Sequence, residues 1–214
     1  MSVFQRARQP EQKTVRRETL IAAATALFDE QGPAGAGLNA IAARAGFTKS
    51  NIYRYFESRE EVLLALLLRE QAAFVAALLE RLDGLTPGFV GAVSATISTE
   101  FLARPRYCKL LSMLSSVLEQ NISEDAIALH KRAILAQFEL LPPALVRALP
   151  KLSLADAQWV FHTIAIFVVG LWPAAFPSPA TARVLERAEF AGTRPVPERD
   201  LPRAILALLR GMGA

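Results

Sequence analysis

The chain has 214 residues, of which 52% are hydrophobic and 21% are charged, and its formal net charge is +4. This composition is typical of a globular protein and excludes an intrinsically disordered one. The single cysteine, Cys108, excludes an internal disulfide and fits a reducing compartment. The first residues contain no apolar stretch of signal-peptide length, and the apolar segment 160–172 is shorter than the roughly 20 residues that span a bilayer. We therefore expect a soluble cytoplasmic protein that is not associated with a membrane.

The positive charge is concentrated at the N-terminal end of the chain. Residues 1–17 contain five basic side chains and one acidic side chain. We expect residues 1–13 to form a basic disordered tail. Two interpretations of this tail remain open: it lies along or in a minor groove of DNA, or it is solvated and adds only nonspecific affinity.

Almost the whole chain is predicted to be helical, because apolar residues rarely alternate with period two and β-branched clusters are scarce. The first helix is expected from about Thr14 to the Gln-Gly-Pro stop signal at 31–33. Two short helices follow at about 39–45 and 49–54. A Ser-x-x-Glu capping box then opens a long helix over about 58–82.

Prolines and glycines divide the remaining sequence into six further helices. These are expected at about 88–103, 105–120, 123–149 (bent or split at Pro142-Pro143), 154–172, 180–191 and 198–211. The sequence thus predicts an all-α protein. Its N-terminal three-helix domain covers residues 14–60, and a C-terminal helical bundle covers residues 61–214.

Residues 38–56 have the pattern of a helix-turn-helix. Gly46 provides the backbone freedom that a tight turn needs, and Ala42 and Ala45 let the two helices approach closely. Phe47 and Ile52 can anchor the second helix in the core. The same pattern also occurs in ordinary short amphipathic helices around a glycine, so the pattern alone leaves both interpretations open.

The second of these helices carries side chains suited to nucleic acid. Residues 44–54 contain three basic side chains and no acidic one. Cationic and hydroxyl donors suit phosphate oxygens, and Asn or Arg can address base edges. Thr48, at the helix start, can also donate to a phosphate. The candidate DNA-contacting residues in this stretch are Arg44, Thr48, Lys49, Ser50, Asn51, Tyr53 and Arg54.

Residues 41–64 read Ile-Ala-Ala-Arg-Ala-Gly-Phe-Thr-Lys-Ser-Asn-Ile-Tyr-Arg-Tyr-Phe-Glu-Ser-Arg-Glu-Glu-Val-Leu-Leu. This segment resembles the TetR family of bacterial transcriptional regulators. Residues 21–32 resemble the first helix of that family, so the similarity covers about 14–66. Its most specific part is the Tyr-x-Tyr-Phe-x-Ser-Arg-Glu segment. The resemblance implies a DNA-binding regulator.

The resemblance assigns roles to individual positions. It implies that residues 49–54 form the recognition helix, that Tyr53 and Tyr55 face phosphate and groove, and that Arg59 contacts a backbone phosphate. Asn39 stands where the family usually has Thr or Ser, and we expect it to keep capping and phosphate-donor chemistry. The pair at residues 50–51 departs from the family's common pair, which leaves the operator sequence open.

The same resemblance implies that residues 61–214 bind a small effector. Aromatic residues are plentiful there and could line an apolar cavity with a few orienting polar groups. The candidate effector contacts are Phe101, Tyr107, Cys108, Gln137, Phe138, Trp159 and His162. Each can equally be a core residue: His162 as a satisfied core histidine, and Cys108 as an inert buried thiol instead of a redox sensor.

A homodimer is expected because one short recognition helix makes too few base contacts for useful specificity. The resemblance assigns the interface to the helices at 154–172 and 198–211. Their apolar faces are supplied by Phe161, Ala165, Val168, Val169, Ile205, Leu208 and Leu209. These residues can also belong to the core of one protomer.

The sequence therefore predicts a ligand-responsive repressor that binds a palindromic double-stranded DNA operator as a homodimer and is released by a small, mainly apolar effector. The alternative is a DNA-binding regulator with no small-molecule effector. The only histidines are His130 and His162, and the sequence contains no HExxH, GxSxG, P-loop or Cys/His metal spacing. We expect no enzymatic activity, no cofactor and no metal site.

Overall fold

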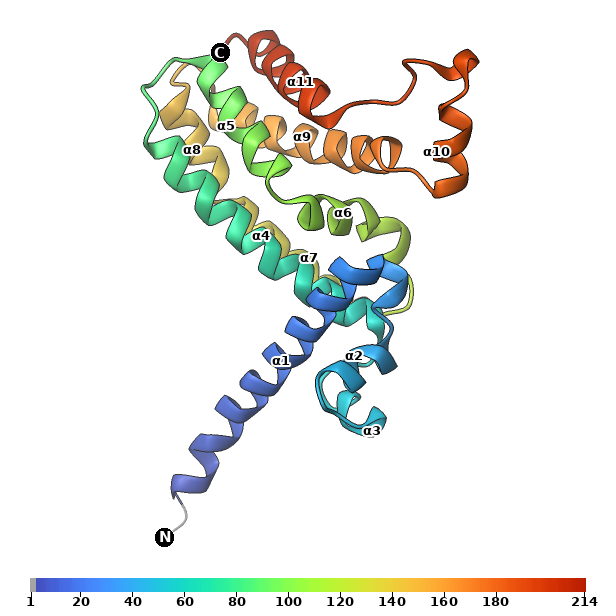
Figure 1. The fold of residues 1–214 in the computed structure, drawn as a ribbon. Helices are drawn as coiled ribbons and strands as arrows, with labels where there is room; N and C mark the ends of the chain where they lie inside the picture. The colour runs from blue at the N-terminus through green and yellow to red at the C-terminus, as the bar shows by residue number, and fades with distance from the viewer. Residues whose placement is uncertain (1–2) are drawn as a thin grey trace. The chain divides into compact units, whose positions relative to one another are not determined.

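The computed structural model describes the backbone of residues 3–214 and the side chains of residues 12–214. Helices account for 77% of the residues, and no strand occurs in the described backbone. The prediction of an all-α protein is therefore confirmed (Figure 1).

The helices of the N-terminal half are α1 (Val3–Gly35), α2 (Leu38–Arg44), α3 (Lys49–Ile52), α4 (Arg59–Asp83), α5 (Val90–Leu102) and α6 (Pro105–Met113). A π-helical turn, η1 (Leu114–Leu118), follows. The second half contains α7 (Glu124–Phe138), α8 (Leu141–Ala148), α9 (Leu154–Ala175), α10 (Pro179–Leu185), a 3-10 turn η2 (Ala188–Phe190) and α11 (Pro197–Gly211).

The chain forms two compact units. The first combines residues 1–68 with the segment Ser115–Ala128, and the second combines Arg69–Leu114 with Leu129–Ala214. The boundary thus lies between Leu68 and Arg69, inside α4, whereas the sequence placed it after Glu60.

In the first unit, α1 packs against α2, and α2 packs against α3. Leu20, Ala24, Leu27 and Phe28 are buried on one face of α1, as their helical spacing predicts. Buried side chains of α2 and of the segment after it complete this core, so the short helices depend on tertiary contacts for their stability.

The start of α1 differs from the prediction. The helix begins at Val3 instead of near Thr14, so the backbone of residues 3–13 is helical and not a disordered tail. Gln, Arg, Glu and Lys dominate residues 5–13 and are strong helix formers, which favours the upstream extension, whereas Pro10 disfavours it. The basic side chains before residue 12 lie outside those described, and their path along DNA remains a prediction. At the other end, Gly32 interrupts α1 with φ 71°.

In the second unit, α9 packs against α6, α8 and α11, and α5 packs against α6 and α11. Leu201, Ile205 and Leu209 recur every four residues on α11 and are all buried. The Ser94 hydroxyl of α5 donates a hydrogen bond of 3.0 Å to the carbonyl of Pro202 on α11. These contacts hold α5, α9 and α11 together.

Three predicted helices are divided in the structure. The segment 105–120 becomes α6 and the π-helical turn η1, the segment 123–149 becomes α7 and α8, and the segment 180–191 becomes α10 and the 3-10 turn η2. Pro142 and Pro143 lie in the first turn of α8, where the missing N–H groups are not needed, so the break precedes them. Pro173, expected to close α9, lies inside that helix, which continues to Ala175.

Two helices, α4 and α9, are long and apolar enough to cross a membrane when only length and composition are considered. In α4, 56% of the apolar segment is buried within the protein, as expected for a core helix. In α9 the buried share is 33%, so much of its apolar surface is exposed.

Candidate DNA-binding interface and effector core

The turn between α2 and α3 depends on the backbone of Gly46. Its φ of 74° lies in the left-handed region that favours glycine. The Gly46 amide donates to the Ala43 carbonyl (3.1 Å), and the Phe47 amide donates to the Ala42 carbonyl (2.8 Å), so the turn closes the end of α2. Ala42 itself is buried. The predicted role of Gly46 is confirmed.

Two apolar side chains anchor the second helix and the turn after it. Ile52 and Phe56 are both buried, and the amide of Phe56 donates to the carbonyl of Ile52 (3.0 Å). Phe47 packs edge-to-face on Tyr55, with ring centroids 6.0 Å apart. The regular helix α3 ends at Ile52, but hydrogen-bonded turns continue through residue 56 and keep residues 53 and 54 in place.

The polar residues around these anchors face solvent. Thr48, Lys49, Ser50, Asn51 and Arg54 are exposed, and Tyr53 is 51% exposed. Among the described side chains, neither Lys49 nor Arg54 forms an ion pair. A short helix therefore presents free cations, hydroxyls and an amide on one side and is fixed to the core on the other.

Thr48 is the N-cap residue of α3, and its carbonyl accepts from the amides of Asn51 (3.0 Å) and Ile52 (3.3 Å). Its hydroxyl makes no capping hydrogen bond and instead lies 3.2 Å from the Ser50 hydroxyl. The first backbone amides of α3 therefore donate no hydrogen bond to the side chain of the N-cap residue.

The flanking candidates have more contacts with neighbouring side chains than the exposed residues of α3 have. Arg44 is paired with Glu30 of α1, and Arg59 is paired with Glu60 at 3.1 Å. Tyr55 is half-buried against Phe47. These side chains would have to leave or share their present partners to contact a phosphate.

The capping role expected for Asn39 is wrong. The N-cap of α2 is Gly37, and Asn39 is the second residue of the helix, with an exposed side chain. The helix starts one residue earlier than predicted because Leu38 is itself helical. Asn39 remains accessible as a phosphate donor.

The capping box at the start of α4 is present in altered form. The Ser58 hydroxyl accepts from the Glu61 amide (3.1 Å), and the Glu61 carboxylate accepts from the amide of Glu57 (2.7 Å) instead of Ser58. The box connects the turn after α3 to α4 and so positions the recognition segment.

Three of the effector candidates lie together in the second unit. Phe101, Tyr107 and Cys108 are buried, and Phe74 of α4 completes their cluster. The Phe74 ring lies 4.4 Å from that of Phe101 and 5.1 Å from that of Tyr107. The Cys108 thiol donates to the Phe101 carbonyl (3.3 Å), and burial raises the pKa of this thiol to about 12. An inert buried thiol is thus the better description of Cys108.

The other four candidates lie elsewhere in the chain. Gln137 and Phe138 are half-buried at the end of α7. Trp159 and His162 are exposed on α9, so His162 is not a core histidine. Helical spacing explains the result: the residues of α9 that face the core are offset from these two positions.

Phe74, which helical spacing placed on the apolar side of the long helix, was not among the effector candidates, and Gln71 was not foreseen as part of this core. Gln71 is fully buried, and its side-chain amide donates to the carbonyl of Ile134 (2.8 Å). Its Oε1 atom and the Tyr107 hydroxyl are buried without a hydrogen-bond partner among the described atoms. A usable signal existed, because Gln71 occurs at helical spacing between the apolar residues Leu67 and Phe74.

Comparison with known proteins covers nearly the whole chain. Residues 20–66 match the family model described as bacterial regulatory proteins, tetR family, and residues 68–214 match the model of a tetracyclin repressor-like C-terminal domain. Two uncharacterized HTH-type transcriptional regulators of Mycobacterium tuberculosis are 42% identical over 53 residues, which is 25% of this chain. The match spans about a quarter (26%) of those relatives.

Solved structures show the same fold. A TetR-family transcriptional regulator from Streptomyces coelicolor has a TM-score of 0.60 at 22% identity, with 92% of this chain and 99% of that chain covered. The repressor AlkX from Dietzia sp. has a TM-score of 0.57 at 16% identity, with coverage of 92% and 95%. The fatty acid degradation regulator FadR from Bacillus halodurans has a TM-score of 0.55 at 19% identity, with coverage of 91% and 94%.

The helix-turn-helix geometry, the exposed cationic face of α3 and the two family matches agree with one another. The chain belongs to the TetR family of DNA-binding bacterial transcriptional regulators.

Proposed function

We propose that the protein is a ligand-responsive repressor in the cytoplasm that binds a palindromic operator as a homodimer and releases it when a small effector binds. The observation that carries the proposal is the division of residues 48–56 into a buried anchor and an exposed donor face. Ile52 and Phe56 lie in the core, while Tyr53 and Arg54 between them are exposed.

The donor face supports recognition of a DNA duplex. An α-helix fits the major groove, and Asn51 and Arg54 carry the amide and guanidinium groups that address base edges. Lys49 and the hydroxyls of Thr48 and Ser50 suit phosphate oxygens, which position the helix. Four residues of regular helix make few base contacts, so specific binding requires a second copy.

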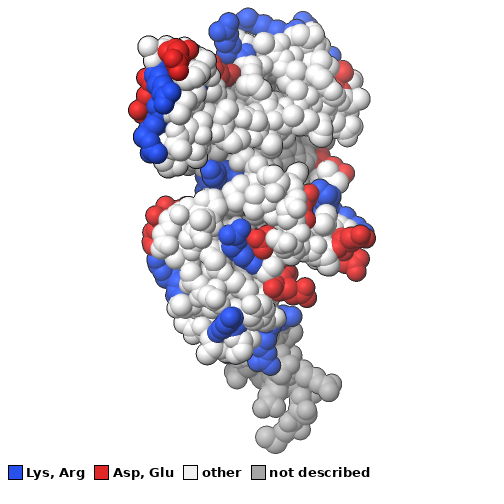
Figure 2. Space-filling model, turned by 90° about the vertical axis from the view of Figure 1, so that its right-hand side faces the viewer, with Lys and Arg blue, Asp and Glu red and all other residues white. Residues whose placement is uncertain are grey.

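The outer face of α9 supports the homodimer. Trp159, Ile166, Phe167 and Val169 are exposed there, and residues 157–182 contain no charged side chain. In the view of Figure 2, the middle of the upper part of the molecule has few charged side chains, which gather at its top and left edges. Exposed apolar patches of this kind are typical of interfaces.

Next to this face, α9 and α11 form a shallow apolar groove of about 270 Å³. It is lined by Thr163, Ile164, Phe167, Ala204, Ile205 and Leu208. We assign the homodimer interface to the exposed residues of α9, which include Phe167 and Val169, together with Leu208 of α11. Phe161, Val168, Ile205 and Leu209, which the sequence offered as interface residues, are buried in the protomer's own core.

The buried aromatic cluster supports a mainly apolar effector. Phe74, Phe101 and Tyr107 offer ring surface, and the Tyr107 hydroxyl and Gln71 Oε1 offer polar atoms that have no partner in the described structure. Buried polar atoms are normally satisfied, so a ligand group that paired with them would gain orientation. Such a ligand shifts the DNA equilibrium only if it binds the released state more tightly.

DNA binding is tested by fluorescence anisotropy with labelled DNA from upstream of the protein's own gene. Arg54→Ala and Tyr53→Ala should each weaken binding about tenfold or more, because a good base contact contributes about 1–3 kcal/mol. Arg183→Ala, at an exposed arginine of α10, serves as the control and should bind as the wild type does. Unchanged affinity in both test variants would overturn the assignment of the recognition helix.

Effector binding is tested by thermal unfolding against a library of apolar compounds. A hit should raise the melting temperature and lower operator affinity, and Tyr107→Phe should reduce the rise if the hydroxyl pairs with the ligand. The absence of any shift, with operator binding intact, would favour a DNA-binding regulator with no small-molecule effector.

A further inference from the structure

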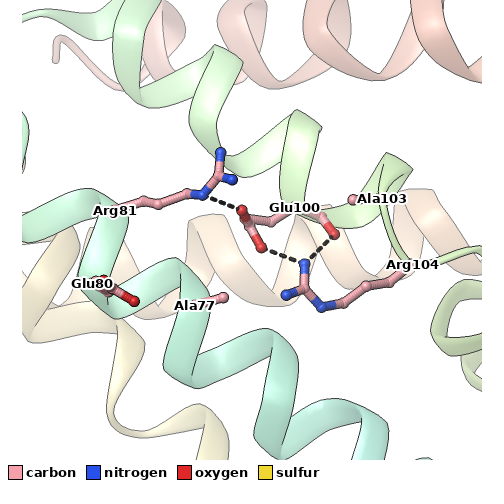
Figure 3. Close-up of a pocket in the computed structure, with 6 residues that line it drawn as sticks. All are labelled: Ala77, Glu80, Arg81, Glu100, Ala103 and Arg104. Atoms are coloured by element: carbon pink, nitrogen blue, oxygen red, sulfur yellow. Dashed lines mark hydrogen bonds and ion pairs between the residues drawn. The ribbon is translucent and has the colours of Figure 1, made fainter.

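An open cleft of about 640 Å³ lies in the second unit, between α4 and the junction of α5 and α6 (Figure 3). Its lining consists of Ala77, Glu80, Arg81, Glu100, Ala103 and Arg104. None of these residues belongs to the buried aromatic cluster or to the recognition helix. The cleft is therefore a feature that the proposed function does not use.

The centre of the lining is a buried carboxylate held by two arginines. Glu100 is 1% exposed. Arg81 Nε lies 2.6 Å from Glu100 Oε1, and Arg104 Nη1 pairs with Glu100 Oε2. Arg104 Nη1 also donates to the main-chain carbonyl of Glu100 (3.1 Å). Figure 3 shows the two guanidinium groups approaching the carboxylate from different sides.

Both arginines keep unused donors. A guanidinium has five N–H donors in a rigid plane, and the contacts to Glu100 engage only Nε of Arg81 and Nη1 of Arg104. The Arg81 side chain is 57% exposed, so its two terminal nitrogens are accessible. Because Glu100 restrains the planes of both groups, the remaining donors are oriented before any ligand arrives.

The two glutamates of the lining differ in their contacts with the arginines. The lining carries two arginines and two glutamates, so its formal charge is zero. The buried Glu100 carboxylate is engaged by both guanidinium groups, whereas the exposed Glu80 carboxylate faces solvent, which screens its charge. Ala77 and Ala103 carry only methyl groups and leave room beside the arginines.

We propose that this cleft binds a small organic oxyanion, a carboxylate or a phosphate, through the free nitrogens of Arg81 and Arg104. The planar forks of arginine match both groups in bidentate geometry. Glu100 is a positioning residue, since its carboxylate is fully engaged by the two guanidinium groups. The cleft has the size typical of small-molecule sites. Anion binding in the cleft does not depend on the operator, so it is tested independently of the proposed function.

Isothermal titration calorimetry tests the proposal with two probes, inorganic phosphate and hexanoate, in buffer whose ionic strength is matched with chloride. At least one probe should bind saturably to the full-length wild type. Arg81→Gln should weaken that binding about tenfold, because it removes charge-assisted hydrogen bonds. Glu80→Gln should strengthen it, because it removes the negative charge from the lining. The probe that binds identifies the oxyanion as phosphate or carboxylate.

Arg147→Gln is the matched control. The Arg147 side chain is 58% exposed and is paired with one carboxylate, that of Asp83 (2.7 Å), but it does not line the cleft. This variant should bind the probe as the wild type does, and circular dichroism should show that both arginine variants are folded. Saturable binding by neither probe would overturn the proposal. Equal losses of probe affinity in Arg81→Gln and Arg147→Gln would also overturn it. So would hexanoate binding that Arg81→Gln leaves unchanged, because such binding would take place in the apolar interior and not in the cleft.

Discussion

The guanidinium carbon of Arg17 lies 4.8 Å from the centroid of the Phe56 ring. Arg17 belongs to α1, and Phe56 is the buried anchor that follows the recognition helix. An arginine that the charge pattern assigned to the basic N-terminal stretch thus has a packing role in the first unit. The contact connects the first helix to the segment that presents Tyr53 and Arg54.

Replacing this cation should destabilise the first unit. Arg17→Ala should lower the free energy of unfolding by about 1 kcal/mol, the magnitude of a partly exposed cation–π contact. Urea unfolding followed by circular dichroism measures the change. Arg17→Lys keeps the positive charge and should lose less, and a lysine variant as unstable as the alanine variant would argue against a cation–π contribution.

Gly46→Ala should destabilise the protein by about 1–2 kcal/mol, because an L-residue in the left-handed region is strained. An added Cβ meets no atom within 4 Å at this position, so the effect isolates the backbone. Gly91→Ala is the control: Gly91 lies inside α5 without a positive φ, and its Cβ site is equally open. That variant should be neutral or stabilised by up to about 1 kcal/mol. Similar melting temperatures for the two variants would contradict the prediction.

The pair between Arg44 and Glu30 should restrain DNA affinity. Both side chains are partly exposed, so breaking the pair affects stability by less than about 1 kcal/mol. Glu30→Gln frees Arg44 for a phosphate, which should tighten operator binding and steepen its salt dependence by about one unit of log–log slope. Anisotropy titrations at several salt concentrations measure both effects. In an Arg44→Gln background, Glu30→Gln should leave the slope unchanged.

Phe167→Arg should prevent dimerisation, because it places a charge on the exposed apolar face of α9. Size-exclusion chromatography with light scattering should show a monomer, and operator affinity should fall by at least about tenfold, since one half-site alone gives weak binding. Leu135→Arg, an equivalent change at an exposed leucine of α7, is expected to leave the assembly as in the wild type. A dimeric Phe167→Arg variant would place the interface elsewhere.

Alkaline pH should weaken the second unit through Cys108. Burial raises the pKa of its thiol from the ordinary 9.0 to about 12. Between these values the unfolded thiol has lost its proton while the folded one keeps it, so the folded state binds more protons. The free energy of unfolding therefore falls as pH rises in this window, by at most about 1.4 kcal/mol per pH unit, and this contribution is fully present below pH 9.

Urea unfolding from about pH 8 to about pH 10.5 measures this dependence. The slope should be smaller in Cys108→Ala than in the wild type. Burial also raises the pKa of Tyr107, so Tyr107→Phe should reduce the slope in the same direction. Parallel curves for the wild type and Cys108→Ala would contradict the assignment.

Local features explain why the DNA-binding end was predictable. Gly46, the apolar anchor Ile52 and the Ser58–Glu61 cap act within a few residues of one another, so their geometry follows from the adjacent sequence. Arg59 and Arg44 were identified as basic, but their pairing with acidic neighbours was not foreseen. Whether two such side chains meet depends on packing between helices or on rotamers.

The effector candidates show the opposite case. Phe101 contacts Tyr107 and Cys108 directly, and α4 adds Phe74 to their cluster. Trp159 and His162 share their helix with core residues but face outward. Helical periodicity shows which residues share a face of one helix. It does not show which face the neighbouring helices cover.

The sequence by itself determined the all-α class, the helix-turn-helix and the donor-rich composition of residues 48–54, because periodicity, turn residues and caps are short-range properties. Only the tertiary structure decided that Glu100 would be buried between Arg81 and Arg104, and that α9 would leave an uncharged apolar face exposed. Both outcomes depend on which distant helices pack together. That choice is made by the summed burial of many side chains, and no single segment encodes it.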